Sequence, residues 1–111
     1  MAYVQQLLKG LIDPIVLSII SRLPMYGYQV VKELEQKTSG YLKLKGGTVY
    51  PALMRLEKKG LVTSKWERNI GQRGRRYYQI TDKGRQFLAK RLSDWQDFYI
   101  VINKLMQETN P

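Results

Sequence analysis

The spacing of apolar residues divides the first third of this chain into three helices. Apolar positions recur every three or four residues over residues 3–11, 14–23 and 28–37. For the second helix, Asp13 is the expected N-cap and Pro14 the expected first helical residue. Its apolar residues point almost all round, which is typical of a buried central helix. The sequence therefore predicts a helical body with this second helix at its centre.

A fourth, shorter helix is expected from Thr48, its predicted N-cap, to a stop at Gly60. Pro51 lacks the N–H that a helix interior needs, so the helix is expected to begin close before it. Its inward stripe consists of Val49, Ala52, Leu53 and Leu56. Its outer side consists of Thr48, Tyr50, Pro51, Met54, Arg55 and Lys58.

A hairpin and a long helix complete the pattern. Residues 61–68 and 75–80 alternate well enough to be strands, with Val62, Trp66, Tyr78 and Ile80 as inward positions. Residues 69–74 include two glycines, which a hairpin tip needs. Thr81 and Asp82 are expected to cap a last helix that continues to about residue 107. This order predicts a mainly α fold with a small β-hairpin: a winged helix-turn-helix followed by a long C-terminal helix.

The last helix carries an apolar seam with heptad spacing. The seam consists of Leu88, Leu92, Trp95, Tyr99, Ile102 and Met106. A small winged-helix body is too short to cover it, which favours a homodimer that buries the seam between two chains. The alternative is a helix folded back on its own domain. The expected organisation is a DNA-binding domain over residues 1–84 and a dimerisation helix over residues 85–111.

The charge distribution points to a polyanion partner. The net charge is +10 over 111 residues, and +9 of it lies between residues 43 and 85. Such a concentrated field favours double-stranded DNA. A membrane partner is not expected, because the basic run lacks a long amphipathic face. No signal peptide or membrane-spanning run is evident, so a cytoplasmic location is expected.

The chain contains neither Cys nor His. Disulfides, thiolate nucleophiles, the usual zinc sites and imidazole bases are therefore excluded. The nine carboxylates form no convincing pair for acid–base chemistry. We expect no metal, no cofactor and no enzymatic activity.

The predicted DNA contacts all lie at a helix start, on the fourth helix or in the hairpin. All but Pro51 have a polar or cationic side chain, and Pro51 is expected to touch a thymine methyl group. Arginines near Gly74 suit phosphates or a narrow minor groove, and residues near a helix N-terminus suit phosphates or base edges. Thr48 can also serve as a cap, and Tyr50 or Tyr28 can instead be packing residues. A solvated charge run is the alternative for the hairpin. The set is Tyr26, Tyr28, Lys45, Thr48, Tyr50, Pro51, Arg55, Lys58, Arg73, Arg75 and Arg76.

Several motifs resemble those of the PadR-like transcriptional regulators along nearly the whole chain. They lie at residues 8–14, 24–28, 47–53, 55–57, 60–62 and 77–84. The most specific are the helix start Gly47-Thr48-Val49-Tyr50-Pro51 and the strand pair Tyr77-Tyr78. A single helix after the hairpin is similar to the short subfamily, which includes phenolic-acid- and multidrug-responsive repressors. The resemblance implies a homodimer that represses transcription from an inverted-repeat operator.

The resemblance also implies a ligand site in the dimer centre. In the short multidrug-sensing members, a Trp on the last helix stacks on planar aromatic drugs, and Trp95 stands at the matching place. The residues expected around it are Leu7, Pro14, Ser18, Phe98 and Tyr99. Two departures stand out: Gln72-Arg73-Gly74-Arg75-Arg76 replaces the usual hairpin pattern, and Tyr99 replaces an acidic residue. The alternatives are that Trp95 only anchors the interface, in a regulator without a ligand, or that the chain is a protein-interaction module.

Overall fold

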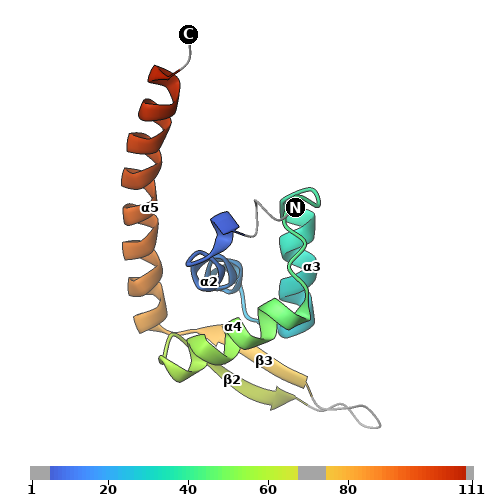
Figure 1. Ribbon diagram of the computed structural model, residues 1–111. Coiled ribbons are helices and arrows are strands. Elements are labelled where there is room, and N and C mark those ends of the chain that lie inside the picture. Colours follow the sequence, from blue (N-terminus) through green and yellow to red (C-terminus); the bar gives the residue numbers. More distant parts are fainter. Residues whose placement is uncertain (1–5, 68–74, 110–111) are drawn as a thin grey trace.

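The computed structural model describes residues 6–67 and 75–109, and its elements follow a winged helix-turn-helix order (Figure 1). The helical part comprises α2 (Ile12–Arg22), α3 (Gly27–Lys37) and α4 (Gly46–Lys58). The sheet comprises β1 (Met25–Tyr26), β2 (Val62–Glu67) and β3 (Arg75–Ile80). The long helix α5 (Asp82–Glu108) follows. This confirms the predicted fold class.

The core lies where α2, α3 and α4 meet above the sheet. Val16 and Leu17 of α2 are fully buried, as is Val30 of α3. All four residues of the predicted inward stripe of α4 are fully buried as well. Because this apolar stripe is buried, the opposite side of α4 is exposed to solvent.

The sheet has the order β1-β3-β2 and is antiparallel throughout. Val62 pairs with Ile80, and Trp66 pairs with Arg76 at the far end of the hairpin. The sequence pattern did not predict β1, whose two residues pair with Tyr77 and Tyr78 of β3. A two-residue strand is too short to show alternation, so periodicity misses it.

The helix α5 runs along one side of the body and extends well beyond it (Figure 1). Thr81 caps it as predicted, since its hydroxyl accepts the N–H of Gly84 at 3.0 Å. Thr81 also donates its hydroxyl to the carbonyl of Gly60 at 2.7 Å, which ties the start of α5 to the end of α4. Within α5 only Gly84 and Leu88 are buried. Among the described residues, no helix combines the length and the hydropathy needed to cross a bilayer.

Three of the predicted helix boundaries were wrong. The N-terminal helix, where it is described, ends at Leu8 instead of residue 11, because Gly10 adopts a positive φ of 82°. The helix α2 has Leu11 at its N-cap, and Asp13 lies inside the first turn. The helix α4 begins at Gly46, two residues earlier than Thr48, with Lys45 at the N-cap. Pro51 therefore offers no N–H to the carbonyl of Gly47, which lies at the exposed surface.

Candidate nucleic-acid interface

The outer face of α4 presents the predicted contact residues of this helix. Thr48, Tyr50, Pro51, Arg55 and Lys58 are all exposed. Thr48 is the third residue of the helix, and its N–H donates to the carbonyl of Lys45 at 2.9 Å. Because Thr48 is not the N-cap, its hydroxyl is not needed to begin the helix. The first turn of α4 thus places the Thr48 hydroxyl on an exposed surface.

Two glycines leave the space in which the ring of Tyr50 lies. A Cβ atom on Gly27, at the start of α3, would collide with Cε1 of Tyr50. A Cβ atom on Gly46 would lie 3.1 Å from Cδ2 and Cε2, on the other edge of the ring. Tyr50 is nevertheless 44% exposed. Tyr50 therefore packs against the two helix starts and also faces solvent. This position suits both roles expected of it, a packing residue and a DNA contact.

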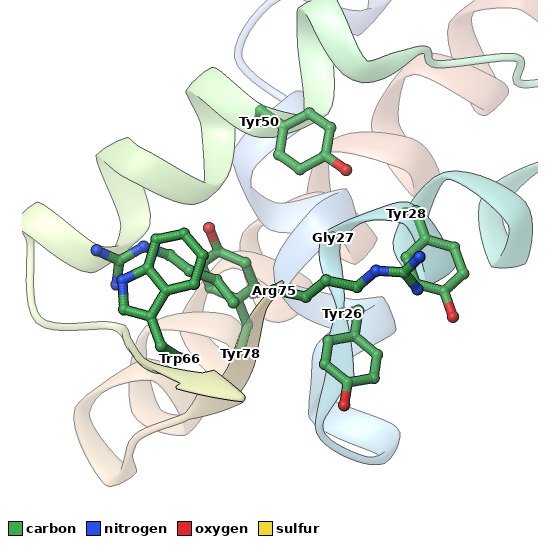
Figure 2. A pocket seen from close by; sticks show the side chains of 8 residues that line it. Tyr26, Gly27, Tyr28, Tyr50, Trp66, Arg75 and Tyr78 are labelled. Atoms are coloured by element: carbon green, nitrogen blue, oxygen red, sulfur yellow. The ribbon is translucent and has the colours of Figure 1, made fainter. Parts of the chain in front are cut away.

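Tyr50 forms the upper wall of a groove that we call the aromatic groove (Figure 2). Its volume is about 410 Å³, and it lies between the starts of α3 and α4 and the end of the sheet where the hairpin loop begins. Its lining residues are Tyr26, Gly27, Tyr28, Tyr50, Trp66, Arg75, Arg76 and Tyr78. The groove brings together five of the predicted DNA contacts, namely Tyr26, Tyr28, Tyr50, Arg75 and Arg76.

Aromatic rings orient both arginines of this groove. The guanidinium carbon of Arg75 lies 4.8 Å from the ring centroid of Tyr28, and that of Arg76 lies 5.0 Å from the ring of Trp66. Lys32 approaches the ring of Tyr28 as well, at 5.7 Å. Such cation–π contacts restrict long, mobile side chains without consuming their hydrogen-bond donors. The groove thus presents positioned cations.

Tyr26 is engaged inside the protein. Its hydroxyl donates to Oε2 of Glu67 at 3.1 Å, and its ring stacks on Tyr28 with centroids 5.9 Å apart. Partial burial, and then the bond to Glu67, raise the pKa of Tyr26 above its ordinary value. Its N–H donates to the side chain of Gln29 at 2.8 Å, which fixes the start of α3. Tyr26 thus supports Tyr28 and the sheet, while its hydroxyl is occupied by Glu67.

Arg55 is held by an ion pair that the sequence did not predict. Its Nε donates to both carboxylate oxygens of Asp13 at 3.2 Å, and its Nη2 lies 2.6 Å from Oδ1. The hydrogen bond to Asp13 raises the pKa of Arg55 above its ordinary value. Asp13 therefore links α2 to the outer face of α4, and this bond replaces its expected role as an N-cap.

Trp66 was expected to point into the core, and this was wrong. It lies on the same face of β2 as the buried Val62, yet 60% of it is exposed. Alternation predicts the face of a strand but not where the covering helix ends, and here β2 continues past the core. Sequence reasoning therefore missed Trp66 as a residue of the groove. The signal in the sequence was Arg76, the residue paired with Trp66 across the sheet, because a cation beside Trp66 indicates an exposed position.

A second hollow, the α2–α5 groove, lies between the N-terminal segment, α2 and α5 and has a volume of about 990 Å³. Five of the six expected ligand residues line it: Leu7, Pro14, Ser18, Trp95 and Phe98. Tyr99 does not line it, although its ring lies 6.2 Å from that of Trp95. The predicted DNA contact Arg73 lies outside the described residues.

The fold agrees with a family match that covers more than half of the chain. Residues 16–90 match the model of the "Transcriptional regulator PadR-like family". The chain belongs to the PadR-like family of transcriptional regulators. PadR-like regulators bind DNA, and the family is one of regulators, not of enzymes.

Relatives of known structure support this assignment over nearly the full length. A PadR family transcriptional regulator from Eggerthella lenta is 35% identical, with 98% of this chain and 92% of that chain covered and a TM-score of 0.86. A transcriptional regulator from Clostridium thermocellum is 32% identical, with coverages of 89% and 96% and a TM-score of 0.82.

The Escherichia coli transcriptional regulator YqjI is similar in sequence over part of the chain. It is 31% identical over 76 residues, which are 68% of this chain and 35% of YqjI.

The structure explains why three motifs of this PadR-like regulator contain a glycine. Gly27 leaves room for the ring of Tyr50, and Gly60 ends α4 with a positive φ of 76°. Gly84 lies against the backbone of Leu61, where a Cβ atom would collide with the carbonyl oxygen. These glycines therefore lie at the starts of α3 and α5 and just after the end of α4, where a side chain would collide or a positive φ is required.

Proposed function

We propose that this PadR-like regulator is a homodimeric repressor that binds an operator with inverted-repeat symmetry. In this proposal residues 1–84 form the DNA-binding domain, and residues 85–111 form the dimerisation helix. A planar aromatic ligand bound near Trp95 relieves the repression. The observation that carries the proposal is the seam of α5, most of which the described residues leave exposed.

The exposure along α5 supports a second copy as the occupant of the seam. Leu88 is only 7% exposed, but Leu92, Tyr99 and Met106 are 49%, 55% and 66% exposed. An apolar surface of this length in a free helix is unfavourable in water. Heptad spacing suits the same seam on a partner helix, so a C2 dimer buries both seams at once. The alternative of a helix folded back on its own domain is at odds with this exposure.

Two DNA-binding faces on one dimer suit a two-fold-symmetric site. Each subunit would place α4 in a major groove and its arginine-rich hairpin against the backbone. The decisive measurement is binding to a symmetric operator and to a random duplex over a range of salt concentrations. If each subunit neutralises about four phosphates, the slope of log K against log salt is expected near −7. Equal affinity for both duplexes, or no salt dependence, would contradict the proposal.

The α2–α5 groove supports the ligand part of the proposal. Trp95 and Phe98 offer aromatic surfaces beside Pro14 and Ser18, and Leu92 continues the apolar wall. A ligand that prefers one spacing of the two α4 helices would shift the dimer towards the form with lower operator affinity. The same aromatic residues also suit a packing role in the dimer, which leads to a regulator without a ligand.

Fluorescence separates these two alternatives. The chain has two tryptophans, so the Trp66→Phe variant reports on Trp95 alone. Planar aromatic compounds are expected to quench its emission and to weaken operator binding, and Trp95→Ala should abolish the effect on binding. If a broad panel of compounds changes neither emission nor operator affinity, the regulator without a ligand is the correct alternative.

A further inference from the structure

The exposed ring of Trp66 needs an explanation beyond folding. Large aromatic side chains stabilise a fold when they are buried, yet 60% of Trp66 is exposed at the rim of the aromatic groove. The hairpin pairs Trp66 with Arg76, so both side chains leave the sheet on the same face. On this face Val62 is buried, whereas Trp66 lies exposed beside the groove (Figure 2).

A chain of polar contacts fixes Arg76 beside this ring. Nη1 of Arg76 donates to the hydroxyl of Ser64 at 2.7 Å, and that hydroxyl donates to Oε2 of Glu57 at 2.6 Å. The Trp66 ring covers one face of the guanidinium at 5.0 Å. Ser64 uses one of the five N–H donors of Arg76. The guanidinium is therefore oriented before any ligand arrives, and further donors remain for an anion.

The surroundings of this pair suit a polyanionic strand. Arg75 contributes a second cation to the groove, and the lining residues include no acidic side chain within the described parts of the chain. The groove reaches from Tyr50 of α4 to the end of the sheet that carries Trp66, Arg75 and Arg76. Alternating phosphates and deoxyribose rings match this combination of guanidinium groups and apolar ring faces.

We propose that Trp66 and Arg76 act together as a clamp on one DNA strand, in which Arg76 binds a backbone phosphate and the ring of Trp66 packs against the neighbouring deoxyribose. This inference rests on the proposed binding of duplex DNA and adds a contact residue to it. Trp66 has two roles in the clamp: it touches the strand, and it positions Arg76. The clamp contributes affinity for any sequence, because sugars and phosphates carry no base identity.

Trp66 emission tests the contact directly. Addition of operator duplex should change the emission of the wild-type protein, and most of this change should be absent in Trp66→Phe, which retains only Trp95. Fluorescence anisotropy of labelled duplex measures binding independently in the same samples. Bound duplex with the same emission change in both proteins would overturn the inference. Absence of binding by anisotropy would instead refute the proposed function.

A double-mutant cycle tests the positioning role. Trp66→Ala and Arg76→Ala are each expected to weaken operator binding about five- to tenfold. The double variant should lose much less than the product of the single effects, because Arg76 acts through the same clamp. In both single variants the salt slope should become shallower by about 0.9 for each phosphate that the protein no longer neutralises.

Matched variants complete the cycle. Trp66→Phe keeps a ring under Arg76 and should retain most of the affinity and the wild-type salt slope. Lys104→Ala removes an exposed positive charge from the distal part of α5, and its salt slope should match the wild type. Wild-type affinity in Trp66→Ala, or independent effects of the two substitutions with an unchanged slope in Trp66→Ala, would overturn the clamp.

Discussion

The ring of Tyr50 occupies the space that a side chain on Gly27 would need. Gly27 is the first residue of α3, and Tyr50 lies in the second turn of α4. Gly46, at the start of α4, lies on the other edge of the same ring. The orientation of Tyr50 on the proposed DNA-binding face thus depends on two glycines in different helices.

Gly27→Ala is expected to displace the ring of Tyr50 and to weaken operator binding by roughly tenfold, a loss of about 1.4 kcal/mol. Stability should change less than binding, because the ring can turn towards solvent and alanine favours the helix. Anisotropy titrations and thermal unfolding of the same samples measure the two effects. In the Tyr50→Ala background, Gly27→Ala should have little further effect on binding.

Gly47→Ala is the matched control for this substitution. Gly47 also lies in the first turn of a helix, but a Cβ atom there meets no other atom within 4 Å. It should leave the ring of Tyr50 in place and stabilise the protein by about 0.4–1 kcal/mol. If Gly27→Ala and Gly47→Ala bind operator equally well, the ring of Tyr50 does not depend on Gly27.

The sequence predicted those parts of the fold in which local patterns determine structure. The stripe of α4, the stop at Gly60 and the cap at Thr81 were confirmed because each depends on residues within one or two turns. The start of α4 was misplaced because Pro51 is a strong local signal, whereas Gly46 and Gly47 allow the helix to begin earlier. The absence of a side chain at Gly46 also leaves room for the ring of Tyr50.

The candidate site was predicted less completely, for a physical reason. Asp13 is a residue type that often caps helices, and it stands just before Pro14, where a cap is expected. Only the packing of α2 against α4 brings it to Arg55, 42 residues away in the sequence. Trp66 was assigned to the core because its strand face is correct, but the core ends before it. Both differences depend on the relative lengths and packing of elements, which periodicity does not encode.

The ion pair between Asp13 and Arg55 should stabilise the protein only modestly. Half of the Arg55 side chain and a fifth of the Asp13 side chain are exposed, at 49% and 19%, so solvent screens the attraction. A double-mutant cycle with Asp13→Ala and Arg55→Ala should give a coupling of about 0.5–1 kcal/mol in chemical denaturation. A coupling near zero would show that the pair contributes nothing in solution.

The same pair is expected to restrain Arg55 on the proposed DNA-binding face. Asp13→Asn removes the charge that holds the guanidinium, so duplex affinity should rise about two- to threefold at low salt, with a steeper salt dependence. Arg55→Ala should remove this gain in the Asp13→Asn background. An unchanged affinity in Asp13→Asn would indicate that Arg55 does not reach DNA when released.

Gly84→Ala should strongly destabilise the protein. A Cβ atom at this position would collide with the carbonyl oxygen of Leu61 and would lie 2.8 Å from Cγ1 of Ile80. The backbone carbonyl cannot move aside, because it also accepts the N–H of Thr81 at 3.0 Å. We expect a loss of about 3 kcal/mol, measured by chemical denaturation. A loss below about 0.5 kcal/mol would mean that the α4–β2 turn adapts to the added methyl group.

Substitutions on two faces of α5 should separate dimerisation from folding. Leu92→Glu places a charge in the proposed seam, so it should shift the protein to a monomer at micromolar concentration in sedimentation and lower operator affinity at least tenfold. Ile100→Glu is the matched control: Ile100 is 63% exposed and lies outside the heptad positions. It should remain dimeric and bind DNA as the wild type does. Both variants should retain the thermal transition of the winged-helix body, since neither residue is buried in its core. If Leu92→Glu sediments as a dimer, or if Ile100→Glu dissociates equally, the seam is not the surface that joins two chains.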